Sequence, residues 1–182
     1  MKKTLALCFA LISAISFSGC LCLFHKPKPP NGHSVFIDTV RNKTQQFGLE
    51  DALQTAMQNQ LLDEGYKIGT RQQSQGILTI TLETYLLIPT QTGANLVPTA
   101  YQLTITAHAV LKDPKTGKVL WSNNNLQGIE PYAAFNMPGG MTEQQAQGVI
   151  WDMMTRFIVA GLDGYFMPAK KKTANAASPA AK

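Results

Sequence analysis

The chain has 182 residues, of which 16 are Lys or Arg and 11 are Asp or Glu, so its formal net charge is +5. Half of the basic residues lie near the two ends. Between Pro29 and Ala169 there are eight basic and eleven acidic residues, so the central part is acidic. A nucleic-acid-binding protein carries its cations on the folded surface, and this distribution therefore excludes nucleic acid as an expected partner. The length favours one domain and disfavours a large enzyme.

The N-terminus has the organisation of a secretory signal. Met1-Lys2-Lys3 is a short basic region, an apolar segment covers 4–17, and the small pair Ser18-Gly19 precedes Cys20. The segment 17–20 (FSGC) resembles the lipobox of bacterial lipoproteins. This resemblance implies a removable signal peptide over 1–19 and lipid attachment at Cys20, with acyl chains such as palmitate. The alternative is an ordinary secretory signal followed by an incidental cysteine.

The regions after the signal differ in composition. Residues 20–32 form a lipidated tether whose prolines favour an extended chain. Residues 33–166 form the folded domain, and the Lys/Ala-rich tail 167–182 is predicted to be disordered. Basic ends beside a lipid anchor could contact an anionic membrane surface, although solvated ends are the simpler interpretation. Leu21, at the second position of the mature chain, implies the outer membrane by resemblance to sorted lipoproteins.

The first half of the domain predicts a strand, a helix and a short strand. The β-branched and aromatic run 34–40 is typical of a strand, and 41–47 reads as a polar loop. An apolar stripe at helical spacing predicts a helix over 49–65, and a short strand follows at 66–68. The stripe consists of Leu49, Ala52, Leu53, Ala56, Met57 and Leu61.

The second half predicts a hairpin of strands and a final helix. Residues 77–88 and 99–111 alternate apolar and polar side chains, and the turn 113–118 leads into a third strand at 119–121. Residues 123–140 read as irregular. Thr142 and Gln145 fit a capping box, which predicts a helix to about Tyr165. The stripe expected on this helix consists of Ala146, Val149, Ile150, Met153, Phe157 and Ala160.

These elements predict an α+β fold, a two-layer sandwich in which a mainly antiparallel sheet of about four strands has two helices on one face. The strand over 99–111 places Tyr101, Leu103 and the following odd-numbered residues on one face, and Gln102 through His108 on the other. The polar face is then open to water or to a partner.

Few residues suggest chemistry. His33 and His108 have no Cys, Asp or Glu at a metal-ligand spacing, so an exposed or hydrogen-bonded role is the simpler one. Glu83 lacks a second carboxylate for acid–base work. The pair Gly139-Gly140 precedes a helix N-terminus, where an anion could bind, but a flexible approach to the helix is the simpler interpretation. We therefore expect no enzyme, no cofactor and no metal site.

Three lysines cluster around the turn at 113–118. Lys112, Lys115 and Lys118 could contact phosphates, although a solvated hairpin tip is the simpler interpretation.

Two blocks carry a family resemblance. The first, 35–68, contains a strand, an N-x-T loop and a helix; the second combines 100–111 (AYQLTITAHAVL) with 116–121 (TGKVLW). Together, behind a lipobox and before a final helix, they are similar to the lipopolysaccharide-assembly lipoproteins of the LptE family. The resemblance covers nearly the whole domain, from Val35 to Tyr165.

The resemblance implies a function in binding. Members of that family are not enzymes; they plug and assist the assembly of the large outer-membrane β-barrel LptD, and they bind lipopolysaccharide on its way to the outer leaflet. One departure is that 89–99 and 126–141 contain no Lys or Arg, whereas family members use basic residues there. No binding residue is therefore transferred, and Lys112, Lys115 and Lys118 remain the candidate lipopolysaccharide phosphate contacts. The alternative is a periplasmic adaptor lipoprotein of the curli-secretion or peptidoglycan-synthase-activator type, which the opening strand and helix also resemble.

Overall fold

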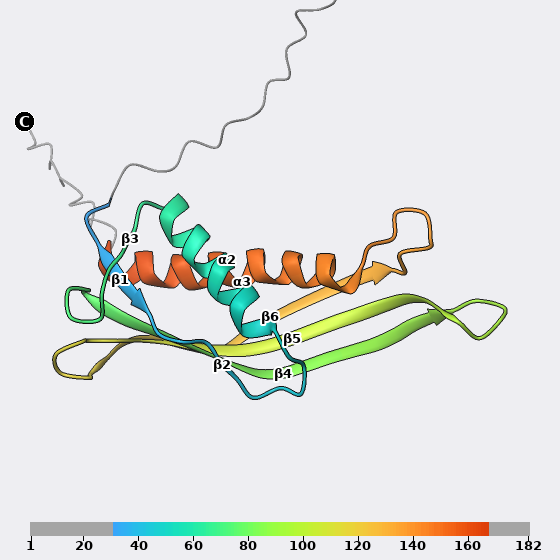
Figure 1. The fold of residues 1–182 in the computed structure, drawn as a ribbon, viewed down its shortest axis with the longest axis horizontal. Helices are drawn as coiled ribbons and strands as arrows, with labels where there is room; N and C mark the ends of the chain where they lie inside the picture. Colours follow the sequence, from blue (N-terminus) through green and yellow to red (C-terminus); the bar gives the residue numbers. More distant parts are fainter. Residues whose placement is uncertain (1–30, 168–182) are drawn as a thin grey trace, which may run out of the picture.

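The computed structural model describes residues 31–167 (Figure 1). The predicted signal peptide, Cys20 and Cys22, and nearly all of the tether and the tail lie outside these residues. The elements follow one another as β1 (Ser34–Ile37), β2 (Arg41–Asn42), α2 (Leu49–Asp63), β3 (Lys67–Ile68), β4 (Gly76–Thr92), β5 (Pro98–Lys112), β6 (Val119–Ala133) and α3 (Glu143–Phe166).

The strands form one six-stranded mixed sheet. Its order is β3-β1-β4-β5-β6, and β2 pairs with β4 beside this path. The long strands β4, β5 and β6 are antiparallel, as the predicted hairpins require, whereas β1 runs parallel to β3 and β4. The parallel pair of β1 and β3 arises because α2 returns the chain to the same end of the sheet. The predicted α+β class is confirmed, and the sheet has more strands than the four expected.

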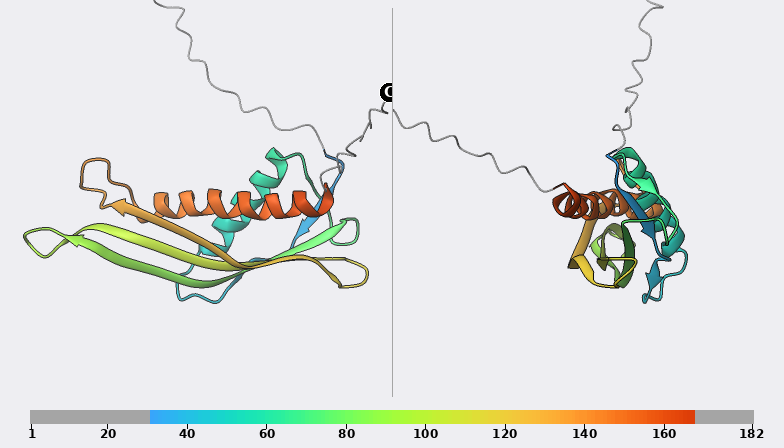
Figure 2. Two further views of the ribbon diagram at one scale, coloured as in Figure 1. Left: turned by 180° about the vertical axis from the view of Figure 1, so that it is seen from behind. Right: turned by 90° about the vertical axis from the view of Figure 1, so that its left-hand side faces the viewer.

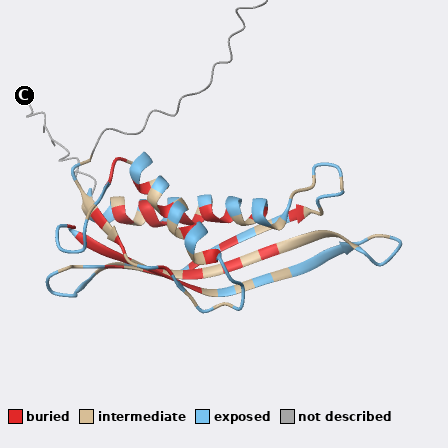
Figure 3. Cartoon of the chain, viewed as in Figure 1, coloured by how far each residue is buried: buried red, intermediate tan, exposed pale blue. Residues whose placement is uncertain are grey.

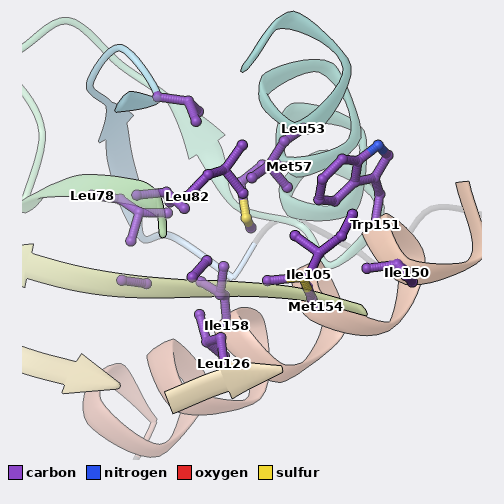
Figure 4. Packing of buried hydrophobic residues seen from close by; sticks show 14 of the residues in the cluster. Leu53, Met57, Leu78, Leu82, Ile105, Leu126, Ile150, Trp151, Met154 and Ile158 are labelled. Carbon is purple, nitrogen blue, oxygen red and sulfur yellow. The ribbon is translucent and has the colours of Figure 1, made fainter. Parts of the chain in front are cut away.

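Both helices lie on the same face of the sheet (Figures 1 and 2). α3 contacts β5 and β6, and α2 contacts α3 and the short strands β2 and β3. The buried residues lie between the two layers (Figures 3 and 4). On β5, the odd-numbered residues from Leu103 to Leu111 are buried, while Thr104, Thr106 and His108 are on the opposite face. The predicted face assignment of this strand is confirmed.

Helix α2 begins at the predicted residue and ends at Asp63, two residues before the predicted bound. Gly48 stands before its first turn in the left-handed conformation, and Glu50 and Asp51 lie in that turn, where they favour the helix dipole. Gly65, with φ of 80°, follows its end. Four members of the predicted stripe are buried: Leu49, Leu53, Met57 and Leu61.

Helix α3 begins with the predicted capping box, in which Thr142 and Gln145 each accept a hydrogen bond from the other's backbone N–H. Its predicted stripe is wrong in part, because Val149 and Phe157 are exposed by 45% and 56%. The helix is apolar on most sides, so periodicity alone cannot choose between overlapping stripes. The side that is buried carries Ala146, Ile150, Trp151, Met154, Thr155, Ile158, Val159 and Leu162.

Strand β6 is much longer than the three residues predicted, because 123–133, expected to be irregular, continues it. Asparagines, Gly128 and Pro131 are weak strand formers, and they are tolerated because β6 is an edge strand. A register shift opposite His108 places one extra residue in β6. The shift reverses the alternation, so that both Trp121 and Leu126 pack on the helix side.

Two glycines set the distance between α3 and β6. A Cβ at Gly128 would lie 2.3 Å from Cγ2 of Ile150, and a Cβ at Gly161 would lie 2.3 Å from the ring of Trp121. Such distances are far shorter than carbon atoms tolerate, so only glycine permits this approach. The side chain of Ile150 therefore lies against the backbone of β6, and the ring of Trp121 lies against the backbone of α3.

We predict that Leu103→Asp strongly destabilises the domain. Leu103 is fully buried, and an unpaired carboxylate in the apolar layer should cost several kcal/mol. Gln102→Asp, one residue away on the uncovered face, is the matched control and should change the free energy of unfolding little. Urea unfolding of both variants tests this. Similar midpoints for the two variants would contradict the face assignment.

Candidate functional site: the open face and the two ends of the sheet

Within residues 31–167, no helix or strand covers the face of the sheet opposite α2 and α3 (Figure 2). We call it the open face. The end of the sheet at which β1 begins and α3 ends is the terminal end, and the end at the β4–β5 hairpin is the distal end (Figure 1). The open face changes in character between the two ends.

A β-bulge at Glu83 determines which side chains β4 presents on the open face. The register shifts by one residue between Leu82 and Thr84, which reverses the alternation of the strand. Beyond the bulge, Tyr85 packs toward the helix layer, whereas Leu86 and Ile88 are about half exposed. Four consecutive large apolar residues at 85–88 cannot fit strict alternation, and this is the signal in the sequence that could have predicted the open apolar side chains.

The exposed apolar side chains are in register across the sheet. Leu86 pairs with Thr104, which pairs with Ile129, itself about half exposed. Neighbouring side chains at these positions form a continuous row. No Lys, Arg, Asp or Glu occurs between Thr84 and Leu111. The distal half of the open face therefore combines aliphatic and uncharged polar groups, a composition that favours contact with another surface over exposure to water.

A charged cluster lies at the bulge itself. The Lys43 ammonium lies 2.8 Å from the Glu83 carboxylate, and Nδ1 of His108 lies 2.9 Å from the same carboxylate. The hydrogen bond from Lys43, with the charges of Lys43 and His108, holds the pKa of Glu83 below its usual value, so the carboxylate stays ionised at neutral pH. Lys43, directly after β2, reaches the cluster because β2 pairs with β4, and local periodicity does not predict this contact. The cluster joins three segments through the ion pair of Lys43 with Glu83 and the polar contact of His108 with Glu83.

Tyr85 connects the distal half of β4 to the start of α3. Its hydroxyl donates to the Glu143 carboxylate and accepts a hydrogen bond from Nε2 of Gln147 at 2.9 Å. Partial burial, followed by the neighbouring carboxylate, raises the pKa of Tyr85 well above its ordinary value. The phenol therefore keeps its proton and acts as a donor.

We predict that Tyr85→Phe lowers the free energy of unfolding by about 1–2 kcal/mol, because the hydrogen bond it removes has an ionised acceptor. Tyr101→Phe is the matched control. Its ring stacks on Tyr132 with centroids 5.6 Å apart, and its hydroxyl has no hydrogen-bond partner among residues 31–167. Chemical denaturation of the two variants checks this, and an equal loss in both would show that the hydrogen bond to α3 contributes nothing.

The three candidate lysines lie at the terminal end, away from the apolar row. Lys112 ends β5, and Lys115 and Lys118 belong to the turn that follows. Asp113 shapes this turn by accepting from the backbone N–H groups of Lys115 and Thr116 at 2.8 and 2.7 Å. Along β5, Lys112 is about 27 Å from Thr104, at about 3.4 Å per residue. The structure does not bring these lysines together with the distal half of the open face.

The other residues considered in the sequence have structural roles. His33 stacks on Phe166 with centroids 4.9 Å apart, and its Nδ1 lies 2.9 Å from Oε1 of Gln75. A Cβ at Gly140 would lie 2.0 Å from the Ala134 carbonyl oxygen, so the loop before α3 requires glycine there. Within residues 31–167 no group of three or more His, Cys, Asp or Glu side chains is placed to hold a metal ion. No helix in the same range has the length and hydropathy to cross a bilayer.

The comparison with protein families classifies the domain. The family model "LptE: Lipopolysaccharide-assembly" matches residues 33–159, which is most of the folded domain. The fold is that of a small α+β domain with one covered and one open sheet face. The chain belongs to the LptE family of lipopolysaccharide-assembly proteins. The recognition made from the two sequence blocks is confirmed.

Several solved structures share a limited likeness with the chain. Lipoprotein GNA1162 from Neisseria meningitidis is 15% identical, with 70% of this chain and 99% of that chain covered and a TM-score of 0.45. A minor lipoprotein from Acinetobacter baumannii is 16% identical, with 72% and 92% covered and a TM-score of 0.47. An uncharacterized lipoprotein B from Nitrosomonas europaea is 12% identical, with 73% and 83% covered and a TM-score of 0.47. The comparison with curated proteins finds no match.

Proposed function

We propose that this protein is an outer-membrane lipoprotein that plugs an LptD-like β-barrel, assists its assembly and takes part in the insertion of lipopolysaccharide at the outer membrane. The match to the lipopolysaccharide-assembly family supports the general role. Members of this family act by binding and not by catalysis, and we propose the same for this chain. Nothing in the sequence or the structure favours the alternative adaptor function.

The distal half of the open face is the observation that best supports the plugging role. The lumen of an outer-membrane barrel is lined largely by polar side chains, and a domain that fills it needs a surface able to contact them over a large area. The uncharged strands between Thr84 and Leu111 offer hydroxyl and amide groups beside the row of Leu86, Thr104 and Ile129. Such a surface makes hydrogen bonds and apolar contacts without the cost of burying unpaired charges.

We predict that Thr104→Glu disrupts the complex with the barrel. Thr104 lies in the middle of the row, so a complex that covers it must bury the new carboxylate. The yield of the barrel that co-purifies from detergent-solubilised outer membranes should fall at least about tenfold, because the burial costs more than the ~1.4 kcal/mol that corresponds to tenfold. Thr55→Glu, on the exposed side of α2, is the matched control and should leave the yield unchanged.

The decisive result against this proposal is recovery of the unsubstituted protein alone while the barrel is intact in the same extract. Equal retention of the barrel by both variants would instead exclude the open face as the contact surface and leave the family role standing.

Attachment through Cys20 is part of the proposal, and so is a position on the periplasmic side of the outer membrane. The lipobox at 17–20 supports both. We predict that Cys20→Ala moves the protein from the membrane fraction to the soluble fraction, because several acyl chains at ~0.8 kcal/mol per buried CH₂ account for retention. Cys22→Ala should remain with the membrane. Fractionation followed by immunoblotting checks this, and retention of Cys20→Ala in the barrel's absence would mean that another feature anchors the chain.

A further inference from the structure

Both ends of the described chain leave the domain at the terminal end. The backbone N–H of Asn31 donates to the Gly65 carbonyl at 3.0 Å, and the ring of His33 stacks on that of Phe166. Cys20 precedes Asn31 by eleven residues, which span at most about 40 Å when fully extended. An anchor at Cys20 therefore keeps the terminal end close to the bilayer.

The sheet layer at this end carries a row of exposed lysines, which we call the lysine rim: Lys67, Lys112, Lys115 and Lys118. The pairing of the strands places them together. Lys67 on β3 pairs with Ser34 at the start of β1, and the carbonyl of Ser34 accepts a hydrogen bond from the backbone N–H of Gln75. Two residues after Gln75, Ile77 on β4 pairs with Lys112 on β5. The rim therefore runs across the strands at the terminal end of the sheet, where the described residues begin and end.

The cations are distributed unevenly along the molecule. No Lys or Arg occurs in 84–111 or in 121–142, the segments that form the distal part of the sheet and the loop before α3. Among the acidic groups of the terminal end, Asp113 shapes the turn and Asp38 lies 3.9 Å from the guanidinium of Arg71. On the helix side, Asp163 accepts the hydroxyl of Tyr66 at 2.6 Å and Asp63 borders a groove between α2 and α3. The positive charge therefore belongs to the sheet layer of the terminal end.

The two segments outside the described residues add charge of the same sign. Lys26 and Lys28 precede Asn31, and Lys170, Lys171 and Lys172 follow Phe166 closely. The sequence therefore carries further lysines on both sides of the described residues.

We propose that the lysine rim binds the anionic phospholipid headgroups of the leaflet that holds the lipid anchor. The proposal rests on the lipid anchoring included in the proposed function. It assigns Lys112, Lys115 and Lys118 to phospholipid phosphates of the membrane, because all three lie at the anchored end. Lys112 is about 27 Å along β5 from Thr104 on the open face. The terminal end lies at the headgroup level, which leaves the distal end and the open face available to the barrel.

The strength of such an interaction follows from general electrostatics. Each lysine close to an anionic bilayer strengthens binding about fivefold, and the attraction falls off within a Debye length. Removing three rim lysines should therefore weaken binding on the order of 100-fold. Because binding depends on screened charges, it should disappear at about 1 M salt, where the Debye length is about 3 Å.

The test uses the mature chain, residues 20–182, with Cys20→Ser to remove the lipid. The buried core lies between Val35 and Leu162, so loss of the signal does not touch it. Sedimentation with vesicles of phosphatidylethanolamine and phosphatidylglycerol is compared with sedimentation with phosphatidylcholine vesicles. The rim variant carries Lys112→Gln, Lys115→Gln and Lys118→Gln. The control variant carries Arg41→Gln, Lys43→Gln and Arg156→Gln, which remove the same charge elsewhere.

We expect salt-sensitive binding to the anionic vesicles alone, lost in the rim variant and kept in the control variant, with melting temperatures close to that of the unsubstituted chain. Equal losses in the two variants, or binding that the rim variant retains, would overturn the proposal. Tighter binding of lipopolysaccharide micelles than of the anionic vesicles, lost in the rim variant, would assign the lysines to lipopolysaccharide and likewise overturn it. If the barrel still co-purifies with the rim variant, the proposed function stands even when the rim proposal fails.

Discussion

The contact of α3 with the edge of the sheet determines the rest of the structure. Gly128 lets the side chain of Ile150 lie against the backbone of β6, and Gly161 lets the ring of Trp121 lie against the backbone of α3. Each large side chain buried in this layer contributes about 1.5–3 kcal/mol. Once the helix occupies this face, the other face of the long strands is left without a cover, and the molecule acquires one closed and one open side.

Two bulges adapt the long strands to this arrangement. One at Glu83 in β4 and one opposite His108 in β6 reverse the alternation partway along each strand. Without them, side chains that now support α3 would point into solvent, because a shift of one residue exchanges the two faces. The bulge in β4 also creates the apolar row on the open face and brings Glu83 to Lys43 and His108. Support of the helix and formation of the candidate binding surface thus have a common local cause.

The long axis of the molecule separates two kinds of surface. At the distal end, β4 and β5 are uncharged beyond the bulge and the loops expose apolar side chains such as Leu96 and Phe135, whereas the terminal end carries exposed lysines on its sheet layer. A domain anchored at its terminal end, as we propose, benefits from this division. Cations close to an anionic bilayer are favourable, whereas a surface that must be covered by a protein partner loses least when it contains no charge.

The sequence by itself determined the local structure and the family. Alternation along β5, the stripe of α2 and the capping box of α3 depend on neighbouring residues only, so each could be predicted. The family resemblance was likewise carried by short blocks. The tertiary structure alone decided which side of the apolar helix α3 is buried, how far β6 extends through its asparagines, and that Leu86 faces outward. These features depend on packing between segments distant in the chain, and a side chain's neighbours across strands are not encoded in its local periodicity.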